Sequence, residues 1–254
     1  MEKDWKGTML KEIATDYGIL FLTDEIELLR EMEKRGEKVA LVVTDANRDM
    51  DFSGISYAVE KTEELEQEDF ERLYRRLAGL PWDILETSRC RLREMTVADV
   101  DRLYEIYEDA SVTKFMEDLY EDREKERKYV EDYCKYIYGF YGYGIWIIEE
   151  KSSGEIIGRA GVEPREEGVE LGYVIADAWQ HRGIAFEVCS AVLKYIRKDI
   201  GWEKVICRVH PGNKASIGLL YKLGFCRSGK VDGEGMMEFE LPGSGEEGQK
   251  KIHG

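Results

Sequence analysis

The segment from Val169 to Ala185 constrains the fold of this chain more than any other part of the sequence. It begins with Val-Glu-Leu-Gly-Tyr-Val-Ile, a run typical of a largely buried strand, and passes through a short turn into the clearest helical pattern, residues 183–200. A strand that enters a helix in this way directs several unpaired backbone N–H groups at one point, where the helix macrodipole adds partial positive charge. The segment therefore predicts an α/β fold with an anion-binding loop.

The loop itself reads Gln180-His181-Arg182-Gly183-Ile184-Ala185. A glycine at position 183 leaves room for a phosphate group, and the guanidinium of Arg182 can add a positive charge. The same six residues taken alone also suit an ordinary turn in which glycine serves only the backbone. The pattern of the surrounding domain favours the phosphate-binding interpretation.

That domain extends over residues 88–242, where strand and helix patterns alternate. Strands are indicated by short apolar runs between glycine-rich turns, and helices by apolar stripes and caps such as Thr96 with Asp99. The predicted strands are 90–94, 144–149, 156–163, 169–176, 204–209, 225–231 and 236–241, and the predicted helices are 96–107, 121–138, 183–200 and 213–223.

Residues 1–87 carry a separate pattern. Two apolar runs, 18–23 and 38–44, predict buried strands joined by a helix, and a second helical pattern follows Thr62. A chain of 254 residues has room for a standard domain and a small one. We therefore predict a small βαβ-type N-terminal domain.

Residues 243–254 predict a disordered tail, because they are rich in glycine and charge. The tail contains a GxGxxG pattern (Gly243, Gly245, Gly248), which is typical of dinucleotide-binding turns. No strand–helix context surrounds this pattern and two glutamates stand where a phosphate would bind, so we assign it no function.

Charge and hydropathy exclude several classes of protein. No stretch approaches the roughly 18 apolar residues of a membrane span, and the first residues are acidic where a signal peptide is basic and then apolar. We expect a cytoplasmic protein without membrane contact. The formal net charge of −16 argues against a nucleic-acid partner, since phosphate is repelled.

Cysteine and histidine contribute little to the expected chemistry. The five cysteines are odd in number and contain no CxxC pair, so neither a disulfide framework nor a zinc site is predicted. Only three histidines are present, and we expect no metal.

Two motifs resemble those of the GNAT superfamily of N-acetyltransferases. Residues 180–185 match the (Q/R)xxGx(G/A) acetyl-CoA loop, and residues 213–225, Asn-Lys-Ala-Ser-Ile-Gly-Leu-Leu-Tyr-Lys-Leu-Gly-Phe, resemble the signature NxxSxxLYxKLGF. Arg-Leu-Arg-Glu at residues 91–94 and Glu-Leu-Gly-Tyr-Val-Ile at 170–175 are similar to the RimJ/RimL branch, which acetylates protein N-termini and includes small-molecule acetyltransferases. The resemblance implies a GNAT fold, with a mixed, mostly antiparallel sheet flanked by helices, and acetyl-CoA as cosubstrate.

The resemblance also implies roles for individual residues. Backbone groups of Val174 and Ile175 would bind the pantetheine arm, and Asn213 and Ser216 would lie along the pantetheine and adenosine part of the cofactor. The pyrophosphate would be held by Gln180, His181, Arg182, Gly183, Ile184 and Ala185. The pair His181-Arg182 departs from the Gly-Lys or Arg-Gly that is frequent in the family, which affects only the side chain that meets the phosphate.

Acetyl transfer needs a neutral amine, a site for the oxyanion and a proton for the leaving thiolate. By resemblance, Tyr221 would protonate the sulfur; as an alternative, it is a packing residue of its helix. Glu170 is the candidate base acting through water, provided that the strand register turns it toward the cofactor. Otherwise it is a solvated strand carboxylate.

The predicted function is acetyl-CoA-dependent transfer of an acetyl group to a primary amine by direct attack. The acceptor is either a protein N-terminus or a small-molecule amine, and the protein is a monomer or a homodimer. The alternative is a non-catalytic GNAT-like module that binds acyl-CoA for regulation or interaction.

Two further features remain open at the level of sequence. Aromatic residues between positions 133 and 146 could line an acceptor pocket or belong to the core: Tyr133, Tyr136, Tyr138, Phe140, Tyr141, Tyr143 and Trp146. Residues 18–60 resemble a degenerate fragment of a haloacid-dehalogenase-like phosphatase, but without its nucleophile motif DxDx(T/V), so phosphatase chemistry is not expected.

Overall fold

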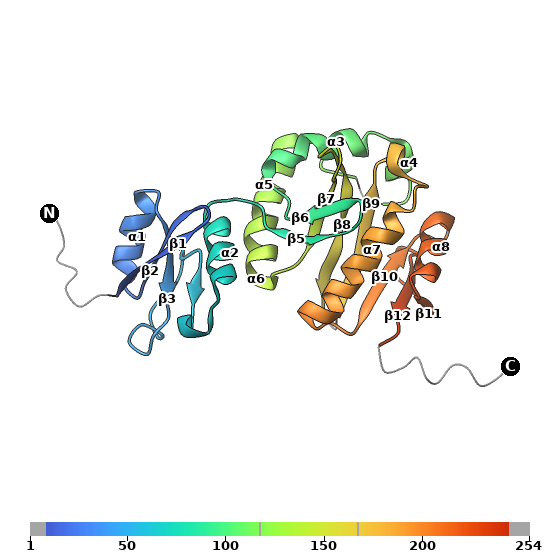
Figure 1. Cartoon of the computed structure of the whole chain (residues 1–254). Helices are drawn as coiled ribbons and strands as arrows, with labels where there is room; N and C mark the ends of the chain where they lie inside the picture. Colours follow the sequence, from blue (N-terminus) through green and yellow to red (C-terminus); the bar gives the residue numbers. More distant parts are fainter. Residues whose placement is uncertain (1–8, 117, 167, 244–254) are drawn as a thin grey trace. The chain divides into compact units, whose positions relative to one another are not determined.

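The computed structural model describes residues 9–116, 118–166 and 168–243, so the predicted tail and all but the first glycine of its GxGxxG pattern lie outside the described residues. The chain divides into two compact units, Met1–Trp82 and Asp83–Gly254 (Figure 1). Among the helices of the described ranges, none is long and apolar enough to cross a membrane.

The first unit contains a four-stranded sheet in the order β1-β2-β3-β4. Strand β1 pairs antiparallel with β2, whereas β2, β3 and β4 run parallel. The elements are β1 (Leu10–Thr15), β2 (Gly18–Thr23), α1 (Ile26–Lys34), β3 (Lys38–Val42), β4 (Ala58–Val59), the 3₁₀ turn η1 (Thr62–Glu64) and α2 (Gln67–Leu77). The predicted βαβ unit is present, and β1 adds an edge strand that the sequence pattern did not reveal.

The apolar runs of β2 and β3 are explained by burial on both faces. Leu20 and Val42 belong to a cluster with Phe70 of α2, whereas Leu41 packs with Leu29 of α1 on the other face. A parallel pair covered by a helix on each side has few solvent-facing positions, here Ile19 at the start of β2, so its sequence is continuously apolar rather than alternating.

The second unit is built on an eight-stranded sheet in the order β11-β12-β10-β9-β8-β7-β6-β5. Its strands are β5 (Asp83–Glu86), β6 (Cys90–Arg93), β7 (Ile145–Glu150), β8 (Ile156–Arg165), β9 (Gly168–Ile175), β10 (Val205–Val209), β11 (Cys226–Val231) and β12 (Met237–Leu241). Its helical elements are η2 (Val97–Asp99), α3 (Val100–Tyr107), α4 (Ala110–Thr113), α5 (Arg123–Tyr133), η3 (Cys134–Tyr138), α6 (Gly139–Tyr141), η4 (Asp177–Trp179), α7 (Ile184–Tyr195), η5 (Ile196–Ile200) and α8 (Lys214–Lys222).

The sheet is mixed and mostly antiparallel, as predicted, because only β9 and β10 pair in parallel. Helix α7 connects these two strands and crosses one face of the sheet (Figure 1), where Val188 and Val192 are fully buried with Leu171 and Cys207. The opposite face of β8 is covered in part by α3, through Tyr107. We call the face that bears α7 the α7 face and the other the open face.

The boundary between the units falls after Trp82, five residues before the predicted one. The reason is β5, which pairs antiparallel with β6 and extends the large sheet by one edge strand. Its sequence, Asp-Ile-Leu-Glu, is too short and too polar at its ends to show a strand pattern, so residues 83–87 were assigned to the wrong unit.

The place of β5 can be tested by truncation. A chain that begins at Asp83 should be more stable than one that begins at Ser88, by about 1–3 kcal/mol, since the shorter chain exposes the β6 edge and removes Ile84 and Leu85 from the core. Denaturant unfolding of the two truncated chains measures the difference. Equal midpoints would show that β5 contributes nothing to the second unit.

Candidate functional site

The predicted loop lies between η4 and α7 and has an unusual backbone. Gly183 precedes the first helical residue with φ of 77°, and His181 has φ of 58°, so two residues of the loop are in the left-handed region. Left-handed residues within a turn orient successive N–H groups toward a common concavity, which is the geometry of backbone anion sites. Glycine at 183 is thus required by the backbone itself.

The N–H groups of this loop are available. Gln180 donates to the carbonyl of Asp177, and Glu187 donates to the carbonyl of Gly183. Within the described ranges no residue accepts a hydrogen bond from the backbone N–H groups of residues 181–185. The site therefore combines free donors with the N-terminus of the twelve-residue helix α7.

A salt bridge fixes the loop to the start of the large sheet. The carboxylate of Glu187 accepts hydrogen bonds from Arg89 N at 2.9 Å, Arg89 Nε at 2.7 Å and Ser88 Oγ at 2.9 Å. Arg89 Nη1 in turn donates to the carbonyl of Arg182 at 2.9 Å. Arg89 and Glu187 were missed by sequence reasoning, because they are 98 residues apart and belong to no local motif.

This salt bridge predicts an acid-dependent contribution to stability. Burial alone would raise the pKa of Glu187, but the hydrogen bonds from Thr87, Arg89 and Ser88 outweigh it and lower the pKa to about 2. Since the folded-state pKa lies below the usual value of 4.5, the contribution is present above pH 4.5 and is lost as the pH falls toward 2.

Glu187→Gln should therefore lower the free energy of unfolding at pH 7 by about 1–2 kcal/mol, and its difference from the native chain should shrink below pH 4. Denaturant titrations across this pH range measure both effects, with the exposed Glu105→Gln as control. A deficit that does not change with pH would contradict the assignment.

The strands β9 and β10 separate after a short parallel pairing. Only two residue pairs are in register, Val169 with Val205 and Glu170 with Ile206. Beyond them β9 continues to Ile175 with no strand partner on its β10 side. The strands thus form an opening that leads toward the loop at 180–185.

Hydrogen bonds at both ends of β9 show which residues face this opening. Val169 N donates to Lys204 O at 3.1 Å, on the β10 side, whereas Ala176 N donates to Ile157 O at 2.8 Å, on the β8 side. Because backbone groups alternate along a strand, odd-numbered residues face β10. Tyr173 and Ile175 therefore present their backbone groups to the opening.

Of the two residues expected to bind the pantetheine arm, only Ile175 has a backbone that faces the opening. The carbonyl group of Ile175 already accepts a hydrogen bond from Gln180 Nε2 at 3.0 Å. The N–H group of Ile175 is therefore the group left to pair with a ligand. Val174 pairs with Arg159 of β8, so its backbone faces away from the opening. The backbone of Tyr173, one residue earlier, faces the opening, which strand alternation could have identified.

Asn213 and Ser216 lie at the start of α8, beside the opening. Asn213 Oδ1 caps the helix by accepting a hydrogen bond from Ser216 N at 3.0 Å. Ser216 Oγ is 2.6 Å from the hydroxyl of Tyr173. The structure thus brings Ser216 and Tyr173 together on the α7 face of the sheet.

Tyr221 is not at the opening. Its ring contacts Phe239 of β12 edge-on, with centroids 5.5 Å apart, and its side chain is 56% exposed. Since β12 and β9 flank β10 on opposite sides, Tyr221 lies on the far side of β10 from Tyr173. The position seven residues after Asn213, which carries tyrosine in the NxxSxxLYxKLGF signature, is Leu220, and Leu220 is fully buried.

Glu170 lies on the open face, but it is not a free carboxylate. Arg165 Nε donates to its Oε2 at 2.6 Å, and Arg208 donates to Oε1 at 3.0 Å and to Oε2 at 2.9 Å. Its side chain is only 13% exposed. Glu163, its register partner on β8, is 40% exposed and contacts Arg165 at 3.2 Å.

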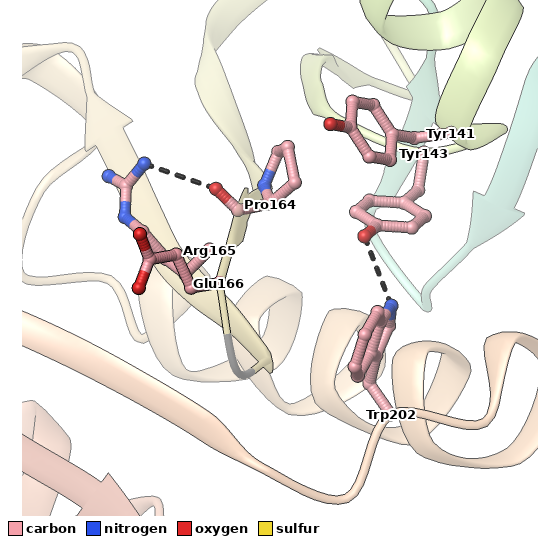
Figure 2. A pocket seen from close by; sticks show the side chains of 6 residues that line it. All are labelled: Tyr141, Tyr143, Pro164, Arg165, Glu166 and Trp202. Carbon is pink, nitrogen blue, oxygen red and sulfur yellow. Dashed lines mark hydrogen bonds between the residues drawn. The ribbon is translucent and has the colours of Figure 1, made fainter.

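The aromatic residues between positions 133 and 146 divide into two groups. Tyr133, Tyr138, Tyr143 and Trp146 are buried, whereas Tyr136, Phe140 and Tyr141 are exposed. A pocket of about 490 Å³ is lined by Tyr141, Tyr143, Pro164, Arg165, Glu166 and Trp202, and Trp202 Nε1 donates to Tyr143 Oη at 3.0 Å (Figure 2). Most of these aromatic residues therefore belong to the core, and of the set only Tyr141 and Tyr143 line this pocket.

No group of histidine, cysteine and acidic residues within the described ranges is arranged to hold a metal ion.

The second unit matches a known family. The family described as Acetyltransferase (GNAT) domain matches residues 89–226, which is more than half of the chain, and the chain belongs to this family of N-acetyltransferases. YkkB of Bacillus subtilis, an uncharacterized protein, is 32% identical over 145 residues, covering 55% of this chain and 83% of that protein. A ribosomal protein uS5-alanine N-acetyltransferase of Escherichia coli is 32% identical over 104 residues, 39% of this chain and 52% of that enzyme.

Solved structures confirm the fold. The ribosomal-protein-S5-alanine acetyltransferase from Vibrio fischeri superposes with a TM-score of 0.55 at 14% identity, over 63% of this chain and 96% of that chain. A GNAT-family acetyltransferase from Bacillus anthracis superposes with a TM-score of 0.52 at 21% identity, over 61% of this chain and 95% of that chain. The similarity to the Escherichia coli enzyme agrees with the predicted RimJ/RimL branch.

Proposed function

We propose that this chain transfers the acetyl group of acetyl-CoA to a primary amine. The observation that carries the proposal is the combination of an N–H-lined loop at the start of α7 with the opening between β9 and β10. An elongated anionic thioester needs both features, one for its pyrophosphate and one for its amide-containing arm.

The residues present fit this cosubstrate. The N–H groups of residues 181–185 would hold the pyrophosphate, with Arg182 as an added positive charge and Gln180 supporting the end of β9. Backbone groups of Tyr173 and Ile175 would pair with the amides of the pantetheine arm in the manner of an added strand. The thioester then lies where β9 and β10 converge, beside Glu170 and Gly172.

The acceptor approaches from the open face, because α7 and α8 cover the other. Its amine must lose a proton before it attacks the thioester carbon, and a carboxylate can accept that proton directly or through water. Glu163 is better placed for this role than Glu170, since both oxygens of Glu170 already accept hydrogen bonds from guanidinium groups. Glu170 is assigned the role of positioning Arg165 and Arg208.

The leaving sulfur needs a proton once the C–S bond breaks. The hydroxyl group of Tyr173, paired with Ser216, is nearer to the opening than that of Tyr221. Burial raises the pKa of Tyr173, so the phenol carries its proton at neutral pH when the sulfur leaves. We therefore assign the proton donor to Tyr173.

A protein N-terminus is the favoured acceptor, because relatives of the family are named for ribosomal-protein acetylation. The alternative, a non-catalytic module that binds acyl-CoA, needs the loop but not the carboxylates of the open face.

The enzyme and the binding module are distinguished by measuring CoA release with acetyl-CoA and a panel of peptides, amino acids, polyamines and aminoglycosides. Release with none of them would favour the binding module.

The loop is tested by Gly183→Glu, which should raise the acetyl-CoA dissociation constant at least about 100-fold by adding negative charge at the pyrophosphate site. Gly183→Asn is the matched control, because asparagine tolerates the left-handed backbone at this position without adding charge. Calorimetric titration measures both. Native affinity in the glutamate variant would show that the loop does not hold the cosubstrate.

The proton donor is tested by Tyr173→Phe, which should lower kcat about 100-fold or more while the acetyl-CoA dissociation constant stays near native. Tyr221→Phe should retain kcat within about threefold, since its ring packs on Phe239. Steady-state kinetics on the two variants compare them directly. A large loss of kcat in Tyr221→Phe, with near-native kcat in Tyr173→Phe, would assign the proton donor to Tyr221 instead.

A further inference from the structure

Arg89 lies against the loop that carries the proposed pyrophosphate site. Its Nη1 donates to the carbonyl group of Arg182 at 2.9 Å, and its Nη2 would be 3.7 Å from a Cβ atom added to Gly183. The guanidinium group is therefore in contact with the left-handed turn that orients the N–H groups of the loop. Because Arg89 immediately precedes β6, the large sheet supplies this cation and the loop itself does not.

The loop is acidic by its own sequence. Between residues 177 and 187 the charged side chains are those of Asp177, Arg182 and Glu187, one positive charge against two negative ones. The whole chain is also strongly acidic, with a formal net charge of −16. A pyrophosphate group approaching the loop is repelled by these negative charges, so a positive charge brought to the loop by the fold offsets the repulsion.

Glu187 is the acid that competes most directly with a bound phosphate, because it lies in the first turn of α7. The partial positive charge of a helix N-terminus attracts a carboxylate as it attracts a phosphate. Arg89 pairs with Glu187 Oε2 through Nε at 2.7 Å and through Nη2 at 2.7 Å. This pair holds the guanidinium group beside the loop and compensates the carboxylate charge that opposes an anionic ligand.

Arg89 also has N–H groups left for a ligand. Each terminal nitrogen of a guanidinium group carries a pair of N–H groups. Within the described ranges, Nη1 of Arg89 donates only to Arg182 O and Nη2 pairs only with Glu187, so one N–H group of each nitrogen is unused. The side chain of Arg89 is 44% exposed, so these groups are accessible to a phosphate oxygen. A guanidinium group that retains terminal N–H groups suits the oxygens of a pyrophosphate.

We propose that Arg89 binds the pyrophosphate group of acetyl-CoA and at the same time offsets the charge of Glu187. This inference rests on the proposed acetyl transfer and adds to its cosubstrate site a residue that precedes Arg182 by 93 positions. If the salt bridge only held the loop in place, Arg89 and Glu187 would be equally necessary for binding. In the proposed role, their charges affect binding in opposite directions.

The test compares the two partners of the salt bridge in the full-length protein by calorimetric titration with acetyl-CoA. Arg89→Met should raise the dissociation constant about 10- to 100-fold, because it removes charge-assisted hydrogen bonds and leaves Glu187 uncompensated. Glu187→Gln should leave the constant within about threefold of native or lower it, because Arg89 remains and the competing carboxylate is lost. In the double variant Arg89→Met/Glu187→Gln, the constant should be at least about fivefold lower than in Arg89→Met.

A second comparison uses S-acetylpantetheine, which has the thioester and the pantetheine arm but no phosphate groups. With the acceptor that gives the fastest CoA release from native protein, Arg89→Met should change kcat/KM for S-acetylpantetheine less than about threefold. The value for acetyl-CoA should fall about 10- to 100-fold. Arg102→Met removes a cation from salt bridges to Glu105 and Glu155, changes the net charge equally and is the matched control that should leave both values unchanged. Arg89→Lys keeps the charge and should weaken acetyl-CoA binding less than Arg89→Met does.

The outcomes separate the two proposals. If Arg89→Met binds acetyl-CoA like the native protein, or loses activity equally with both thioesters, the role of Arg89 is wrong while acetyl transfer stands. Weakening by Glu187→Gln of about tenfold or more has the same meaning, and this variant decides the question if Arg89→Met folds poorly. If no acceptor supports CoA release although acetyl-CoA binds, the proposed acetyl transfer itself fails.

Discussion

The early end of the β9–β10 pairing is the constraint on which the site depends. After Glu170 and Ile206 the two parallel strands no longer pair, so β9 presents backbone donors and acceptors with no strand partner on that side. Such groups are stable in a folded protein only where solvent or a ligand can satisfy them. Helix α7 begins beside the same end of β9, and its free N–H groups extend the polar lining of the opening. The proposed cofactor site is thus made mainly of backbone groups, which agrees with the unusual His181-Arg182 pair in its loop.

The two faces of the large sheet have different roles. On the α7 face, apolar residues and two buried thiols, Cys189 and Cys207, anchor the helix that carries the loop. On the open face, Glu163, Arg165, Glu170 and Arg208 alternate in sign across three adjacent strands. Because each charge there has an opposite neighbour, the face can be polar and partly buried without a large desolvation penalty. Arg159, on the same face, donates a hydrogen bond to the hydroxyl of Tyr107.

The N-terminal unit has its own core on both faces of a four-stranded sheet, which accounts for its separate sequence pattern. The family match does not reach it, and its resemblance to a phosphatase fragment remains a prediction. Its composition is acidic, since residues 1–82 carry 20 acidic and 12 basic side chains. A surface of that charge would attract cationic acceptors at low salt and lose this effect as ionic strength rises.

The sequence by itself determined the features that depend on neighbours along the chain. Strand and helix patterns, the Thr96–Asp99 capping box and the loop at 180–185 all follow from interactions within a few residues, and the structure contains each of them. Tertiary structure decided the rest. A single step along β9 exchanges Val174 for Tyr173 at the opening, and a single step along α8 turns the side chain by about 100°, which separates buried Leu220 from exposed Tyr221. Arg208 reaches Glu170 across 38 residues of sequence, and Arg89 reaches Glu187 across 98. Such pairings depend on strand order and register, which local periodicity does not encode.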